Sequence, residues 1–352
     1  MKPISSRQAT CLLLVVLSGW SLTMTAQDGR DGWIVLLLAG LCSLPVAALC
    51  CLASERMPQG EWFQLPRAAF GAVGSTLYVW VLAAVSLWSL CMTVLSGVIF
   101  LRTVSGGIWP VWLLTAALLV CAAAAAHRGV QPLVLWMQPM VWLVVLALLV
   151  SLVLSWSQLD FYALRPILSD GVENLPKRVY LLLSAPFGEV FYAAAVLGGQ
   201  GTRIRNGLLR ACVLAGVWLS VLYLRNICLL GEAGARGVLY PSYTAASVLS
   251  FGEAFQRGEV LISGSLLVCT VARAALILSF FAGCVQAGST CRKSRGVWLG
   301  AILTGAICML CAGGNQAFGM AQEFYQIFFL PVVVLAAGAL FLKGRTISNT
   351  RR

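Results

Sequence analysis

Long apolar stretches recur along the whole chain, with only short polar segments between them. Each stretch has about 20 residues, the length that an α-helix needs to cross a hydrocarbon core of about 30 Å. Charged residues make up only 10% of the 352 residues, against about 25% in a typical soluble domain. The chain is therefore predicted to be an integral membrane protein. Its ten expected spans lie at residues 8–25, 33–53, 73–100, 109–126, 134–155, 179–198, 208–230, 260–284, 297–313 and 325–342.

The segments between these spans are too short to fold as separate domains, so we expect one membrane domain over residues 1–352. It divides into five spans, an extracytoplasmic connection and five further spans, at residues 1–156, 157–178 and 179–345. The first span begins after Lys2 and Arg7, as a secretory signal would. We expect it to be retained, because cleavage would remove the even span count.

The net charge of +12 is distributed unevenly across the predicted membrane. With the N-terminus inside, fifteen Lys and Arg residues fall on the inner side and seven on the outer side. Because Lys and Arg concentrate in cytoplasmic loops, both termini are predicted to be cytoplasmic. This pattern explains the excess of basic over acidic residues without a nucleic-acid partner. The anionic partner that we expect is membrane lipid.

Residue types typical of enzymes and metal sites are sparse. The single histidine, His127, lies at a span end and is interpreted as an interfacial residue. Cys308 and Cys311 have the spacing of a redox or metal motif, but their apolar helix offers no histidine or carboxylate, so packing is the favoured role. No HExxH, GxSxG or P-loop pattern is present. We expect no enzyme activity, no metal and no cofactor.

Two spans are interrupted near their centres. The sixth carries Pro186 and Gly188 directly before Glu189, and the first carries the run Ser18-Gly19-Trp20-Ser21. Proline removes a backbone donor and clashes with the preceding turn, so the helix should open there. In hydrocarbon, an opened backbone is tolerated only where protein or a water-filled cavity satisfies its polar groups. A carboxylate beside such a break is therefore a candidate functional residue.

Both interrupted spans open a group of five, and an odd number inverts the second group relative to the first. Interrupted helices at corresponding places of inverted halves indicate a transporter-type site. The predicted fold class is an all-α membrane protein with ten transmembrane helices in a 5+5 inverted repeat, with helices 1 and 6 broken. Residues 60–70 and 240–258 are expected to form interfacial amphipathic helices. The alternative is that Ser18 and Gly19 only allow close helix packing.

The ends of the broken helices form the candidate ligand site. Half-helix N-termini favour a carboxylate and freed carbonyls favour an ammonium group, so the site suits a zwitterionic amino acid. Trp88 on the third span is a candidate aromatic lid. The expected ligand-binding residues are Ser18, Gly19, Trp20, Ser21, Ser184, Ala185, Pro186, Phe187, Gly188 and Glu189.

The run Ser184-Ala185-Pro186-Phe187-Gly188-Glu189-Val190 resembles the proline-phenylalanine-glycine-glutamate stretch in the B subunits of bacterial spore germinant receptors. Other segments resemble that family in the same order, at residues 4–8, 100–104, 159–168 and 240–255. The resemblance implies the amino acid–polyamine–organocation fold, the ten-span repeat of LeuT-like transporters. The chain departs from the family at residues 91–96, which lack the charges expected in many relatives, and in a first span without proline.

This resemblance also implies a function. It predicts a receptor subunit that binds a small nutrient such as an amino acid and helps to trigger germination. The implied partners are A-type and C-type receptor subunits, and the implied location is the inner membrane of the spore. The alternative is a secondary permease for an amino acid or amine, which would share the fold. A purely structural scaffold would not explain two aligned breaks beside a carboxylate.

Two arginines fall within predicted spans. Arg273 lies near the middle of the eighth span, where it needs an acceptor. In LeuT-like folds this span faces a sodium site, so the resemblance implies that the Arg273 charge substitutes for sodium. The alternative is a structural charge paired with Glu189 or with carbonyl groups. Arg225 lies nearer a span end and is expected to snorkel to water or to pair with a loop.

Overall fold

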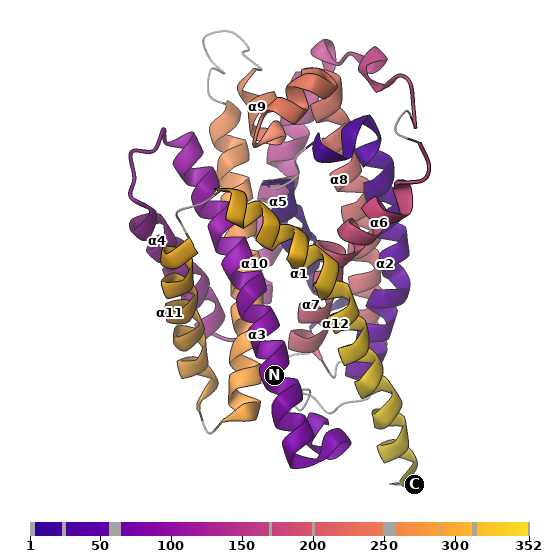
Figure 1. The fold of residues 1–352 in the computed structure, drawn as a ribbon, viewed down its shortest axis with the longest axis vertical. Helices are drawn as coiled ribbons and strands as arrows, with labels where there is room; N and C mark the ends of the chain where they lie inside the picture. Colours follow the sequence, from indigo (N-terminus) through magenta and orange to yellow (C-terminus); the bar gives the residue numbers. More distant parts are fainter. Residues whose placement is uncertain are drawn as a thin grey trace.

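The computed structural model describes residues 4–22, 26–55, 65–168, 171–198, 201–248, 258–289, 291–311 and 315–350. Helices account for all regular structure within these ranges, and most run along the long axis of one bundle (Figure 1). The α-helices are α1 (Ser6–Ser18), α2 (Gly32–Glu55), α3 (Leu65–Val104), α4 (Val111–His127), α5 (Val130–Ser155), α6 (Leu175–Ser184), α7 (Val190–Leu197), α8 (Thr202–Gly237), α9 (Pro241–Ser247), α10 (Gly258–Gly288), α11 (Lys293–Cys311) and α12 (Asn315–Thr350). The 3₁₀ turns are η1 (Gly19–Leu22), η2 (Ala26–Asp31), η3 (Trp156–Gln158), η4 (Phe161–Leu164) and η5 (Phe187–Glu189).

Each predicted span overlaps a helix, and the sixth overlaps two, α6 and α7. Among the described residues, eight helical segments are long and apolar enough to cross a membrane, with α6 and α7 counted together as Leu175–Leu197. Helices α1 and α4, at the places of the first and fourth predicted spans, are apolar but have only 13 and 17 residues. The structure is therefore that of a multi-pass membrane protein. The count of ten, its 5+5 grouping and the single-domain boundaries stay predictions.

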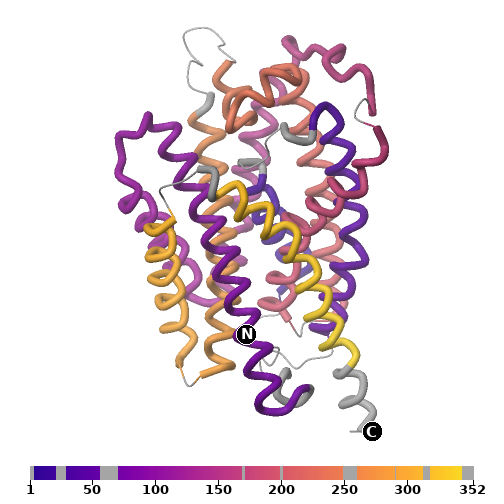
Figure 2. Tube along the Cα trace, in the orientation of Figure 1, coloured from indigo at the N-terminus to yellow at the C-terminus, as the bar shows by residue number. Residues whose placement is uncertain are grey.

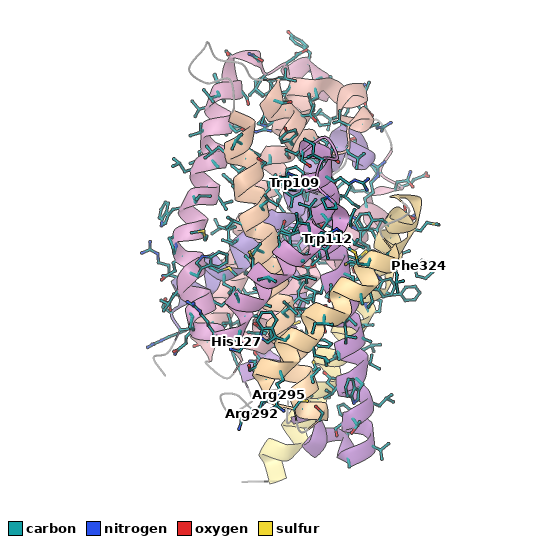
Figure 3. The ribbon with its side chains drawn as sticks, turned by 90° about the vertical axis from the view of Figure 1, so that its left-hand side faces the viewer. Trp109, Trp112, His127, Arg292, Arg295 and Phe324 are labelled. Carbon is teal, nitrogen blue, oxygen red and sulfur yellow. The ribbon has the colours of Figure 1, made fainter. Side chains whose placement is uncertain are left out.

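The lateral surface of the bundle is apolar. Large side chains such as Trp112, Leu146 and Ile302 are more than half exposed, which would be unfavourable in water but suits contact with lipid. Figure 3 shows His127 nearer than Trp112 to the end of the bundle where Arg295 lies. This position at the end of α4 agrees with the interfacial role expected for His127.

The ends of the chain lie toward one end of the bundle and α9 toward the opposite end (Figures 1 and 2). This arrangement agrees with an even number of crossings, while the cytoplasmic side stays a prediction. Helix α9 lies within the expected interfacial segment 240–258, of which residues 249–257 fall outside the described chain. In the segment 60–70, residues 65–70 are helical and end at a kink at Gly71, whose φ is 72°; residues 60–64 are outside the described chain.

Small residues bring α1, α2 and α8 close together and so position the first broken helix. A Cβ atom on Gly40 of α2 would lie 2.8 Å from Gly216 Cα of α8. A Cβ atom on Gly207 of α8 would clash with the Ser6 carbonyl oxygen of α1. Beside this contact, Thr10 Oγ1 donates a 2.9 Å hydrogen bond to the Gly207 carbonyl. Small residues at such contacts are typical of membrane helices, because they let backbones approach and associate by dispersion.

Candidate functional site: a buried ion pair at the broken helices

The first helix ends where the sequence predicted its interruption. Helix α1 begins with a capping box between Ser5 and Gln8 and stops at Ser18, after which the chain continues as the 3₁₀ turn η1. The Ser18 hydroxyl donates a 2.7 Å bond to the Leu14 carbonyl of its own helix. Gly19 faces α10, and a Cβ atom there would lie 3.4 Å from Cys269 atoms. The end of α1 therefore packs in close contact with α10.

The sixth predicted span is broken at its proline. Helix α6 ends at Ser184, Ala185 is extended with φ −144° and ψ 115°, and η5 follows Pro186 before α7 begins. The break is buried, since Ala185 and Phe187 are both 0% exposed. Part of the opened backbone is satisfied by protein groups, since the Glu189 amide donates a 3.1 Å hydrogen bond to the Pro186 carbonyl. The Ser184 hydroxyl next to the break accepts a 3.0 Å hydrogen bond from the Leu330 amide of α12. This is the condition under which a membrane helix can be interrupted.

The break places Glu189 opposite Arg273 of α10. Arg273 Nε donates to Glu189 Oε2 at 2.7 Å, and Arg273 Nη2 donates to Glu189 Oε1. Both residues are buried, with 0% of Glu189 and 3% of Arg273 exposed. Two parallel charge-assisted hydrogen bonds of this kind are strong and directional. In the low dielectric of the bundle interior, the pair neutralises two charges that would each be costly alone.

An aromatic ring covers the guanidinium from the first broken helix. The Arg273 Cζ atom lies 4.5 Å from the centroid of the Trp20 ring, within the range of a cation–π contact. Trp20 belongs to η1 and is 5% exposed. One site therefore joins the break of the first helix, the break after α6 and the middle of α10.

Tyrosine and serine hydroxyls complete the polar surroundings of Glu189. The Tyr325 hydroxyl of α12 donates to Ser89 Oγ of α3 at 2.9 Å and makes a longer 3.5 Å contact with Glu189 Oε1. The buried hydroxyl of Tyr192 on α7 lies beside Ser89 and Tyr325. Phe329 packs between the two tyrosines, with ring centroids 5.6 Å and 4.8 Å away. These residues were not predicted from the sequence, because a tyrosine in an apolar span is indistinguishable there from a packing residue.

The predicted site residues divide into three groups. Trp20 and Glu189 contact Arg273 directly, while Gly19 and Gly188 supply close packing against Cys269 and the Phe329 ring. The remaining described residues of the two breaks are buried around this centre; they are Ser18, Ser184, Ala185, Pro186 and Phe187. The side chain of Ser21 lies outside the described part of the structure.

Trp20 is the aromatic residue that contacts Arg273. The predicted lid, Trp88, is 37% exposed and its ring lies 6.3 Å from that of Tyr325, so its role as a lid stays a prediction. The expectation for Arg225 is corrected in part. Arg225 does not snorkel, because its residue is 0% exposed. It does contact the connection to the next span, through the Ser242 carbonyl of α9 at 3.0 Å. Helix α8 continues beyond Arg225 to Gly237, and α9 packs against α8, so water is out of reach.

The helical bundle and its central breaks define a multi-pass membrane protein of the transporter-like class. Solved structures share this fold. The chain aligns with a manganese transporter of Eremococcus coleocola, bound to an aromatic bis-isothiourea compound, with a TM-score of 0.58 and 12% identity. A histidine-to-alanine mutant of that transporter gives a TM-score of 0.59 and 14% identity; each alignment covers 94% of this chain and 76% of the transporter. Among the described residues, no group of three or more His, Cys, Asp or Glu side chains gathers to hold a metal ion.

Residues 4–317 match the family described as spore germination protein, so the chain belongs to this family. A curated relative is the spore germination protein YndE of Bacillus subtilis. It is 22% identical over an alignment of 305 positions, which covers 82% of each chain. The family resemblance stated from the sequence is therefore confirmed, as is the transporter-like, membrane-embedded character of the chain.

Proposed function

We propose that this protein is the B-type membrane subunit of a spore germinant receptor, which binds a small amino-acid-like nutrient at the broken helices and helps to trigger germination. The observation that carries the proposal is the buried Glu189–Arg273 pair, which joins the break after α6 to the middle of α10 beneath Trp20. A carboxylate and a guanidinium held face to face match the two charges of a zwitterion. An amino acid inserted between them exchanges one internal ion pair for two: its ammonium with Glu189 and its carboxylate with Arg273.

This exchange gives a physical basis for selectivity. Separating the charges without replacement costs about 3–5 kcal/mol, because each would be left buried and unpaired. A zwitterion restores both pairings, whereas a simple amine or carboxylic acid restores only one. Because Trp20 lies over Arg273 and Glu189 begins the helix that continues as α7, ligand entry also displaces elements of both broken helices. That displacement is the signal we propose to reach the partner subunits.

Arg273 has a second proposed role at the same place. Its fixed positive charge between η1 and α7 takes the position of a coupling cation, so ligand binding is sodium-independent. The sequence left open a structural role for Arg273, in which it pairs with Glu189. Pairing with Glu189 and replacing a cation are compatible, because one guanidinium can do both. Ligand responses measured in sodium and potassium buffers should coincide.

The alternative function is a permease that moves an amino acid or amine, and the transporter-like fold favours it. A germination assay and an uptake assay together distinguish the two functions. In spores that lack the gene, complementation with the intact chain should restore germination by an amino acid from a panel of twenty. Cells expressing the chain alone should accumulate no radiolabelled form of that amino acid. Concentrative uptake by this chain alone would favour the permease.

The proposal includes partners and a location. A-type and C-type subunits should co-purify with the tagged chain from spore inner membranes, and both termini should face the spore core. Recovery of the chain only from vegetative membranes, without either subunit, would count against a receptor role.

A further inference from the structure

A second buried arginine lies away from the ion pair, between α5, α8 and α9. Arg225 of α8 is 0% exposed. Its Nη1 donates to Ser151 Oγ of α5, and its Nη2 donates to Asn226 Oδ1 at 2.9 Å and to the Ser242 carbonyl of α9 at 3.0 Å. Asn226 Nδ2 in turn donates to Ser242 Oγ at 2.9 Å. Three helices therefore meet at one guanidinium.

This arginine has no acidic partner in the described chain. The described ion pairs are Arg30–Glu232, Arg205–Glu55, Arg236–Glu232 and Arg273–Glu189, and none includes Arg225. The acceptors that it does have are all neutral: a hydroxyl, an amide oxygen and a backbone carbonyl. An arginine remains charged in proteins, and a buried charge is normally paired with an opposite one. Within the described chain, the charge at Arg225 lacks this compensation.

The cluster also contains more hydrogen-bond donors than acceptors. Arg225 Nε is buried and has no hydrogen-bond partner among the described residues. Asn226 uses one of its two Nδ2 hydrogens, and the hydroxyls of Ser151 and Ser242 accept bonds there, with no acceptor for their own hydrogens in the described chain. Unused donors around an uncompensated positive charge are the environment that binds an anion. A structural clamp alone would not require this surplus.

We propose that a small monovalent anion, of the class of chloride, binds at Arg225 between α5, α8 and α9. Arg225 Nε supplies the charge, and the Ser242 hydroxyl and the second Asn226 Nδ2 hydrogen supply further donors. The enclosure limits the size of the anion, since Asn226 and Ser242 are each only 3% exposed and Ser151 is 4% exposed. Helix α9 also contacts η1, so the bound anion secures the connection that packs on the first broken helix.

The site is tested by the thermal stability of the purified full-length protein in detergent. Sodium chloride is titrated against sodium gluconate at constant ionic strength, because the gluconate anion is too large for an enclosed site. Ligand that binds only the folded state raises the melting temperature, so chloride should raise it by about 2 °C or more. Sodium bromide should act similarly. A parallel titration with sodium acetate tests whether the site binds a carboxylate instead of an inorganic halide.

Variants test whether the chloride-dependent rise in melting temperature depends on Arg225 and Ser242. Arg225→Gln should abolish the anion-dependent shift. Ser242→Ala removes one donor to a charged group, so the half-stabilising chloride concentration should rise about tenfold. The matched control is Ser247→Ala on the same helix. The Ser247 residue is exposed and its hydroxyl donates to the Thr244 carbonyl, so this variant should behave as the unmodified protein. If Arg225→Gln does not fold, the comparison of Ser242→Ala with Ser247→Ala decides the test.

A shift caused by chloride and bromide and lost in the cluster variants would support an inorganic anion. A shift caused by acetate instead, and lost in the same variants, would support the same anion site with a carboxylate as its occupant. The proposal is overturned if no small anion changes the melting temperature, or if Ser242→Ala and Ser247→Ala respond identically to the unmodified chain. These outcomes do not depend on whether an amino acid binds at Glu189.

Discussion

Arg273 and Glu189 are 84 positions apart in the chain, yet the Arg273 guanidinium donates two hydrogen bonds to the Glu189 carboxylate. The pair connects α10 to the point where the sixth predicted span resumes as α7. Because both side chains are buried, water cannot solvate the charge that remains when its partner is removed. Stability and ligand response are thus linked at a single contact, and variants there must be designed to separate the two.

Glu189→Gln and Glu189→Ala should both reduce stability and abolish the ligand response. Each leaves Arg273 buried without its counter-charge, a loss of about 3–5 kcal/mol. The combined change Glu189→Gln with Arg273→Gln removes both charges and should recover protein level but not the response. Glu55→Gln is the matched control, because Glu55 pairs with Arg205 at 3.3 Å where both side chains are partly exposed, and such pairs contribute at most about 1 kcal/mol. Normal germination by a stable Glu189→Ala variant would remove the central support for this site.

Substitution of Arg273 tests the geometry as well as the charge. Arg273→Met should abolish the response, since Glu189 would be left buried as an unpaired carboxylate or a protonated acid. Arg273→Lys keeps the charge but offers no planar pair of donors, so it should retain part of the function. Dose–response curves for spore germination, taken with membrane protein levels, measure both effects. A fully active Met variant would leave Arg273 without the proposed role.

The parts of the site that depend on local backbone chemistry could be predicted from the sequence. Pro186 followed closely by Gly188 disfavours a continuous helix, so the break was correctly placed. A proline alone is not sufficient, since Pro45, Pro139 and Pro331 lie inside continuous helices. The apolar stretches likewise predicted where the helices lie, because length and composition alone determine whether a segment suits a membrane. Span number could not be settled in the same way, since α1 and α4 are shorter than the predicted stretches.

The parts that depend on packing could not be predicted. Sequence alone left open whether Arg273 meets Glu189, because the contact requires α7 and α10 to be oriented toward each other. Tyr325 and Ser89 join the site from α12 and α3, and nothing in their local sequence distinguishes them from packing residues. Arg225 was expected, from its distance to a span end, to snorkel to water or to pair with a loop. Its burial results from the cover of α9, which is a tertiary contact.

Gly19→Leu should weaken the ligand response at unchanged protein level. A Cβ atom at Gly19 would lie 3.4 Å from Cys269 atoms, so the first atom fits in ordinary contact but a longer branched side chain must displace η1 from α10. Gly19→Ala should therefore be nearly neutral. Gly338→Leu on α12 is the control, because no atom lies within 4 Å of a Cβ added there. An unchanged dose–response for Gly19→Leu would place the ligand elsewhere.

The topology prediction is tested independently of the site. Reporter fusions after Arg178 and after Arg352 should report opposite sides of the membrane, the first outside and the second in the cytoplasm, as the Lys and Arg distribution requires. A fusion after His127, at the end of α4, should report the cytoplasm. The same side for the first two fusions would contradict ten spans.

Tyr325→Phe isolates the hydroxyl that contacts both Ser89 and Glu189. Removing it deletes the 2.9 Å bond to Ser89 and the longer contact to Glu189 while preserving the ring packing against Phe329. A neutral buried hydrogen bond contributes about 1 kcal/mol, so stability should fall modestly. If the hydroxyl helps to hold Glu189 for the ligand, the germinant concentration for half-maximal response should change about fivefold.

Tyr78→Phe provides the matched comparison for this prediction. The Tyr78 hydroxyl of α3 donates a 3.1 Å bond to the Ala336 carbonyl of α12, so the variant removes a similar hydroxyl between the same two helices but away from the ion pair. Its stability loss should be similar and its germinant response unchanged. Equal shifts in the response of the two variants would mean that the Tyr325 hydroxyl acts only by holding α3 and α12 together. A shift confined to Tyr325→Phe would place this hydroxyl in the ligand-sensing site with Glu189.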